Sequence, residues 1–68
     1  MKISARNQLA GKVVAVSRGA AIANVELDVA GQRLVASITV EAADELDLQP
    51  GREAIAVIKA SDVMIAAT

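Results

Sequence analysis

The chain has 68 residues, which allows one small domain, and its seven basic and eight acidic residues give a formal net charge of −1. That balance argues against a nucleic-acid binder or a membrane-surface protein, which need clustered positive charge, and the absence of Cys and His excludes disulfides, thiolate metal sites and the usual general base. The apolar runs are far shorter than the roughly 20 residues of a spanning helix, and MKISARNQ at the N-terminus lacks the apolar stretch of a signal peptide. We therefore expect a cytoplasmic protein with no membrane partner.

Hydrophobic residues make up 54% of the chain, yet Phe, Trp and Tyr are all absent, so the core must be built from small aliphatic side chains. A chain of this size buries only about 60% of the surface that its unfolded form exposes. A monomer would have to expose its aliphatic excess in patches, whereas association with copies of itself would bury them. The composition therefore predicts a homo-oligomer.

Two antiparallel strands are expected first along the chain. Residues 8–17 are rich in Val and predict a strand, within which Gly11 indicates a bulge or a close approach of another backbone. A turn is expected around Gly19. Residues 21–29 then alternate strictly, with apolar side chains at the odd positions, a pattern typical of a half-buried strand.

A third strand and a short helix follow. Residues 33–39 alternate again and predict a strand, and Thr39 at its end is a suitable N-cap for a helix. Val40, Ala43 and Leu46 share helical spacing, so they are expected to form the apolar stripe of that helix.

Two further strands are expected after the helix. Pro50 and Gly51 suit the two central positions of a type II turn, which ends the helical segment. Residues 53–59 predict a fourth strand, residues 60–62 interrupt it, and residues 63–66 predict a short fifth strand.

The order of three strands, one helix and two strands is that of an OB-like five-stranded barrel. No linker, low-complexity segment or internal repeat divides the chain. We therefore predict an all-β fold with one short helix, formed as a single domain over residues 1–68 and assembled as a homo-oligomer.

The ionisable side chains give little support for catalysis. Asp44, Glu45 and Asp47 lie on or beside the exposed face of the predicted helix, where solvated charges are common. No nucleophile–base pair, P-loop or G-x-S-x-G motif occurs, and no carboxylates have the spacing of an EF-hand-like cation site. The expectation is a binding protein, not an enzyme, with no metal ion held directly by side chains.

Small hydrogen-bond donors gather in two segments that flank strands. Ser4–Gln8 near the N-terminus and Lys59–Asp62 near the C-terminus contain hydroxyl, guanidinium, amide and ammonium groups. Donors with net positive charge are typical of an oxyanion site. Taken singly, the first segment is equally typical of a solvated arm and the second of a turn.

The two segments together carry a resemblance to a known family. SARNQLAGKV, joined at this separation to VIKASDVM, resembles the molbindin or Mop family of small cytoplasmic molybdate-binding proteins, and the likeness covers residues 4–66. The family implies an OB-like barrel assembled as a hexamer, a trimer of dimers, with oxyanion sites between subunits. It also implies a second class of site near the threefold axis, whose residues motif position does not identify.

The resemblance also implies which residues bind the oxyanion. They are Ser4, Ala5 and Arg6 from one subunit and Lys59, Ala60 and Ser61 from another, with Ala5 and Ala60 acting through their backbones. Molybdate is a tetrahedral dianion that only accepts hydrogen bonds, so a site of donors without carboxylates suits it, and tungstate is nearly isosteric. The implied function is intracellular storage and homeostasis of molybdate or tungstate, without an organic cofactor.

Two other functions are compatible with parts of the sequence. An OB-type module that only assembles, without a small ligand, fits the aliphatic composition equally well, but it has no need of the paired donor segments. Binding of single-stranded nucleic acid relies on aromatic side chains and a basic groove, and this chain has no aromatic residue and a slight negative charge.

Overall fold

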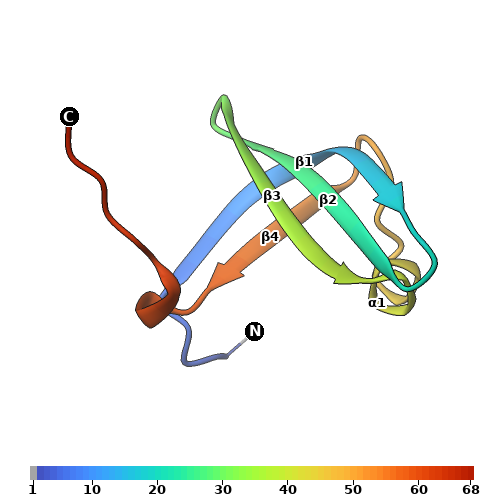
Figure 1. The fold of residues 1–68 in the computed structure, drawn as a ribbon, viewed down its shortest axis with the longest axis horizontal. Coiled ribbons are helices and arrows are strands. Elements are labelled where there is room, and N and C mark those ends of the chain that lie inside the picture. The colour runs from blue at the N-terminus through green and yellow to red at the C-terminus, as the bar shows by residue number, and fades with distance from the viewer. Residues whose placement is uncertain (1) are drawn as a thin grey trace.

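The computed structural model describes residues 2–68. It is mostly β, with one short helix, and its elements follow one another in the order predicted as far as the fourth strand (Figure 1). The elements are β1 (Asn7–Arg18), β2 (Ile22–Val29), β3 (Gln32–Thr39), α1 (Val40–Glu45), β4 (Glu53–Ile58) and the 3₁₀ turn η1 (Ala60–Asp62).

The four strands form one antiparallel sheet in the order β3-β2-β1-β4. The first half of β1 pairs with β4 and the second half with β2, and only Lys12 has a partner on both sides. An extra residue, Val14, bulges between Val13 and Ala15, and bulges bend a strand and increase its twist. The bend therefore lets one long strand serve two halves of a curved sheet.

The concave side of this sheet holds a small aliphatic core. Five residues are buried: Val13, Ala23, Val25, Leu27 and Ala43. The three on β2 occupy the odd positions of the predicted alternation, which the structure confirms. Because of the bulge, Val16 instead of Ala15 joins Val13 on the core side of β1. Eleven large apolar side chains remain exposed within residues 2–68.

The hairpin between β2 and β3 turns through Ala30 and Gly31, whose φ angles are 50° and 85°. Positive φ at both central residues is the signature of a type I′ turn, in which an Asn-Gly pair is preferred. Since Ala lacks the local hydrogen bonding that makes left-handed backbone tolerable for Asn, Ala30→Asn is expected to raise the free energy of unfolding by about 0.5–1 kcal/mol. The free energy of unfolding is measured by urea titration, with far-UV circular dichroism as the signal. Ala30→Val adds a β-branched side chain at the same position and should lower the free energy of unfolding.

The predicted start of the helix is confirmed, but the prediction that Leu46 belongs to its apolar stripe is wrong. The Ala42 backbone N–H donates to Thr39 Oγ1 at 3.0 Å, as an N-cap requires, and Ala43 is fully buried. Leu46, however, follows the last helical residue as the C-cap and is 62% exposed, because the helix ends before the third position of the stripe.

The N-cap gives a further prediction. Thr39→Ala removes the acceptor for the Ala42 N–H and is expected to lower the free energy of unfolding by about 1 kcal/mol, whereas Thr39→Ser keeps it. The same urea titration, at one fixed protein concentration, compares the two variants. Equal losses in both would show that the methyl group of Thr39 matters and the cap does not.

The predicted fifth strand does not form within the chain. The turn at Pro50 and Gly51 is as expected, with the Arg52 N–H donating to the Gln49 carbonyl at 3.0 Å and Gly51 at φ 93°. After η1, however, residues 63–68 have no sheet partner and remain exposed. β3 and β4 are therefore the two edges of the sheet, and the predicted five-stranded barrel is replaced by a four-stranded sheet. Within residues 2–68, no helix has the length and apolar character to cross a bilayer.

Candidate functional site

Antiparallel pairing of β1 with β4 brings the two donor segments to the same end of the sheet. Asn7, the first residue of β1, pairs with Ile58, the last residue of β4. Residues 4–6 precede this pair and residues 59–61 follow it, so they leave the sheet side by side (Figure 1). Segments more than 50 positions apart in the sequence thus meet at one place.

Two amides beside the donors have structural roles. Asn7 Nδ2 donates to the Ile58 carbonyl at 3.2 Å and fixes the start of β1 against the end of β4. Gln8 Nε2 donates to the Ala5 carbonyl at 3.2 Å and holds the N-terminal segment close to the strand. Both amides therefore help to fix the position of the N-terminal segment at the start of β1.

The second segment is shaped by η1. The Asp62 N–H donates to the Lys59 carbonyl at 2.9 Å and the Val63 N–H to the Ala60 carbonyl at 3.3 Å, so one tight turn follows β4. The first N–H groups of such a turn have no acceptor within it. The Ala60 and Ser61 amides are thus donors that the turn itself does not use.

Ion pairs distinguish Arg6 and Lys59 from most other cations of the chain. Arg18 Nη1 lies 2.6 Å from Asp44 Oδ1, Arg33 Nε 2.6 Å from Glu26 Oε1, and Arg52 Nη1 2.9 Å from Asp47 Oδ2. Within residues 2–68, Arg6 and Lys59 form no ion pair.

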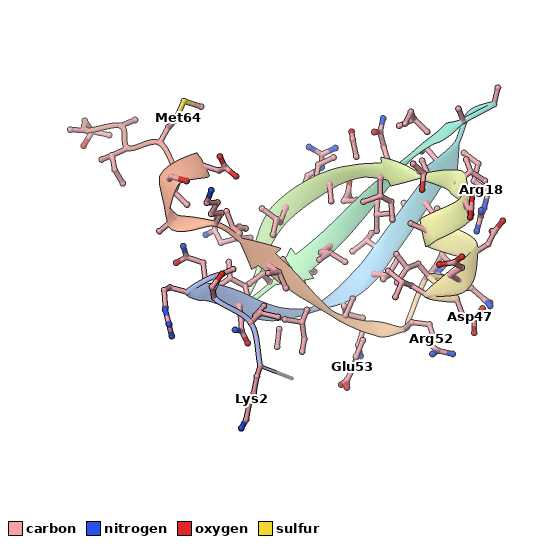
Figure 2. The ribbon with its side chains drawn as sticks, turned by 90° about the horizontal axis from the view of Figure 1, so that it is seen from below. Lys2, Arg18, Asp47, Arg52, Glu53 and Met64 are labelled. Atoms are coloured by element: carbon pink, nitrogen blue, oxygen red, sulfur yellow. The ribbon has the colours of Figure 1, made fainter. Side chains whose placement is uncertain are left out.

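Two of the three paired arginines lie at the other end of the molecule from the donor segments. Arg18 and Arg52, with Asp47, lie at the end that carries α1, opposite the end from which the two chain termini leave (Figure 2). At the donor end, Arg6 and Lys59 are without an ion pair within residues 2–68, although the carboxylate of Asp62 belongs to the same turn as Ser61.

The donors lie on an open surface in a single chain. Ser4, Arg6, Lys59, Ala60 and Ser61 are exposed, and Ala5 is half-buried. Across residues 2–68, no group of three His, Cys, Asp or Glu side chains converges as a cation site. The chemistry of this end is that of donors for an anion, and in a single chain these donors are largely open to solvent.

Comparisons with known proteins agree with this chemistry. The TOBE domain family matches residues 3–65. Molybdenum-pterin-binding protein 3 of Clostridium pasteurianum is 52% identical over 68 residues, covering 98% of this chain and 100% of its own. The chain belongs to the molybdenum-pterin-binding (Mop) family of TOBE domains.

Solved structures of Mop-related proteins have the same fold. A molybdate-binding protein from Sporomusa ovata superposes with a TM-score of 0.94 at 37% identity, covering 98% of this chain and 100% of that one. The cytoplasmic molybdate-binding protein ModG, in a form with molybdate bound, superposes with a TM-score of 0.90 at 45% identity, over 94% of this chain and 46% of that one. The relationship predicted from SARNQLAGKV and VIKASDVM is therefore confirmed.

Proposed function

We propose that this Mop-family chain binds molybdate, and tungstate as its near-isostere, through Ser4, Ala5, Arg6, Lys59, Ala60 and Ser61. The observation that carries the proposal is the meeting of both donor segments at one end of the sheet, with two cations that form no ion pair within residues 2–68. Family membership supports the ligand class, because relatives with the same fold are molybdate-binding proteins.

The residue types suit a tetrahedral dianion. Arg6 and Lys59 supply charge-assisted hydrogen bonds, each worth about 1.5–3 kcal/mol, and the hydroxyls and backbone amides supply directional donors. Several such bonds outweigh the cost of association and give micromolar affinity or better. Pocket size would discriminate against sulfate, and phosphate is disfavoured because its remaining proton would face donors. No bond forms or breaks, so the activity is reversible binding without catalysis.

The ligand in this proposal is the bare oxyanion, without an organic cofactor. The curated relatives carry "pterin" in their names, and an aromatic pterin ring is commonly held by stacking. This chain has no aromatic side chain to offer for that purpose. Titration with molybdate alone therefore tests the proposal directly.

We further propose that the sites lie between subunits of a cytoplasmic homo-oligomer, a hexamer built as a trimer of dimers, which stores the anion and releases it by mass action. Two features support assembly. The donors are largely open to solvent in a single chain, and within residues 2–68 eleven large apolar side chains are exposed whereas five apolar residues are buried. Light scattering at micromolar concentration is expected to give six times the 7.0 kDa chain mass. A mass of one chain would contradict the assembly.

Isothermal titration of the purified protein with molybdate, tungstate and sulfate tests the binding. Molybdate and tungstate are expected to bind with micromolar dissociation constants or lower, and sulfate far more weakly. Because charge dominates the contacts, affinity should fall as ionic strength rises. Absence of heat and of retained metal with both metal oxyanions would exclude the proposal and favour an assembly module without a small ligand.

A further inference from the structure

The backbone N–H groups of both donor segments lack an acceptor within residues 2–68. The N–H groups of residues 4–6 and 59–61 are donors in none of the backbone hydrogen bonds that lie outside the strands and helices of this part of the chain. They also donate to none of its side chains. Because a backbone N–H is an obligatory donor, each segment presents three consecutive amides to solvent or to a ligand.

The peptide group that precedes Arg6 is held by the side chain of Gln8. Gln8 Nε2 donates to the Ala5 carbonyl at 3.2 Å. No cis peptide bond occurs within residues 2–68, and in a trans peptide the carbonyl and the following N–H point in opposite directions. The bond therefore also fixes the Arg6 N–H, which points away from Gln8. It turns a carbonyl oxygen, which would repel an anion, toward a donor of its own chain.

The peptide group that precedes Lys59 is held in the same way by Asn7. Asn7 Nδ2 donates to the Ile58 carbonyl at 3.2 Å, in a partly buried contact between residues 51 positions apart. The Lys59 N–H then points away from Asn7. Two consecutive side-chain amides thus fix the peptide groups immediately before Arg6 and Lys59, the two cations of the proposed site.

We infer that Gln8 and Asn7 are positioning residues of the oxyanion site, and that each aims one backbone N–H, that of Arg6 or of Lys59, at the bound anion. The inference rests on the proposed function and deepens it, because it adds two main-chain donors to the charged groups of the same residues. The side chains of Arg6 and Lys59 are exposed and must be ordered when the anion binds. A peptide group that is already held in place does not add this cost of ordering.

Truncation of each amide tests the inference. Gln8→Ala and Asn7→Ala each release one carbonyl, so molybdate is expected to bind each variant about 10-fold more weakly, as for the loss of one donor to a charged ligand. Isothermal titration measures the affinities, and far-UV circular dichroism checks the fold. Wild-type affinity in the Gln8→Ala variant would overturn the inference.

Gln32→Ala is the matched control. Gln32 is an exposed amide at the start of β3, and its side chain forms no hydrogen bond within residues 2–68. The control is expected to bind molybdate as the wild type does. A loss of affinity as large as that of Gln8→Ala would show that the peptide groups are not what Gln8 contributes, and would overturn the inference.

The amide proton resonances distinguish positioning from a general loss of structure. An N–H that donates to an anion shifts downfield, so saturation with molybdate is expected to shift the Arg6 and Lys59 amides in proton–nitrogen correlation spectra of the wild-type protein. Gln8→Ala should reduce the Arg6 shift and preserve the Lys59 shift, and Asn7→Ala should do the reverse. Reduction of both shifts in Gln8→Ala would indicate a merely structural role and overturn the inference. Gln8→Ala decides the matter even if Asn7→Ala does not fold, since the Gln8 contact is exposed and joins residues three positions apart.

The wild-type protein separates failure of this inference from failure of the proposed function. Molybdate binding without a shift of the Arg6 and Lys59 amides would overturn the inference and leave the proposed ligand in place. Absence of binding heat and of retained molybdenum would instead exclude the proposed function itself.

Discussion

Replacing both Arg6 and Lys59 by Ala is expected to abolish measurable molybdate binding while leaving the fold intact. Each residue contributes a charge-assisted hydrogen bond in the proposed site, so each single variant should weaken binding by about 10- to 100-fold, and the double variant by about 1,000-fold or more. Both side chains are exposed and form no ion pair within residues 2–68, so their loss removes no contact that the chain needs for folding. Isothermal titration measures the affinities, and far-UV circular dichroism checks the fold.

Arg33→Ala is the matched control for this experiment. Arg33 is also an exposed arginine, but it pairs with Glu26 on the β2–β3 hairpin, away from the start of β1. An exposed pair of this kind contributes only about 0–1 kcal/mol to stability, so the control should fold and bind molybdate as the wild type does. Normal molybdate binding by the double variant would contradict the proposed site, even though the family is established. If Arg33→Ala weakened binding as much as the variants of Arg6 and Lys59 do, the loss would reflect a general effect of net charge.

The local parts of the fold were predictable because local chemistry dictates them. The alternation of residues 21–29 predicted β2, the hydroxyl of Thr39 predicted the helix start, and Pro50 with Gly51 predicted the turn before β4. In each case the signal and the structure that it determines lie within a few residues. Leu46 was misassigned because helical spacing says nothing about where a helix ends.

Long-range features escaped prediction because the segments that form them are distant from one another in the sequence. The bulge at Val14 forms where β1 exchanges one partner strand for another, and no glycine or proline marks it in the sequence. Residues 63–66 have the composition of a strand, but they pair with neither edge of the sheet in the structure, and composition does not reveal this. That β3 and β4 form the two edges follows only from the sheet order.

The sequence predicted the two donor segments of the candidate site, but it did not show that they lie close together in space. Each motif alone is compatible with a solvated arm or a turn, and only antiparallel pairing of Asn7 with Ile58 brings the two together. The ion pairs of Arg18, Arg33 and Arg52 had no sequence signal either, because their acidic partners lie 5 to 26 positions away in the sequence. That three of the four arginines are neutralised within the chain, leaving Arg6, is therefore information that only the structure supplies.

Gly11 is the residue whose replacement is expected to damage the fold most. A Cβ at this position would lie 2.7 Å from the Asp28 carbonyl oxygen and 2.8 Å from Val29 Cγ2, well inside van der Waals contact. The close backbone approach predicted for this glycine is thus confirmed, whereas the bulge lies at Val14. Because Lys12, the next residue, is paired with Asp28 on one side and Glu53 on the other, β1 cannot move away from β2 without breaking its ladder with β4.

Gly11→Ala is therefore expected to lower the free energy of unfolding by about 2–3 kcal/mol, the upper part of the range for overpacking, and the midpoint of thermal unfolding by roughly 10–20 °C. Gly31→Ala is the control, since it has φ 85° but no atom within 4 Å of the added Cβ, and should cost only the roughly 1 kcal/mol of left-handed backbone. Thermal unfolding of both variants at one protein concentration distinguishes the cost of the steric contact at position 11 from the cost of a left-handed backbone at position 31. If Gly11→Ala were no less stable than Gly31→Ala, the strands would have room to separate, and the curved sheet that brings the donor segments together would be less rigid than its pairing indicates.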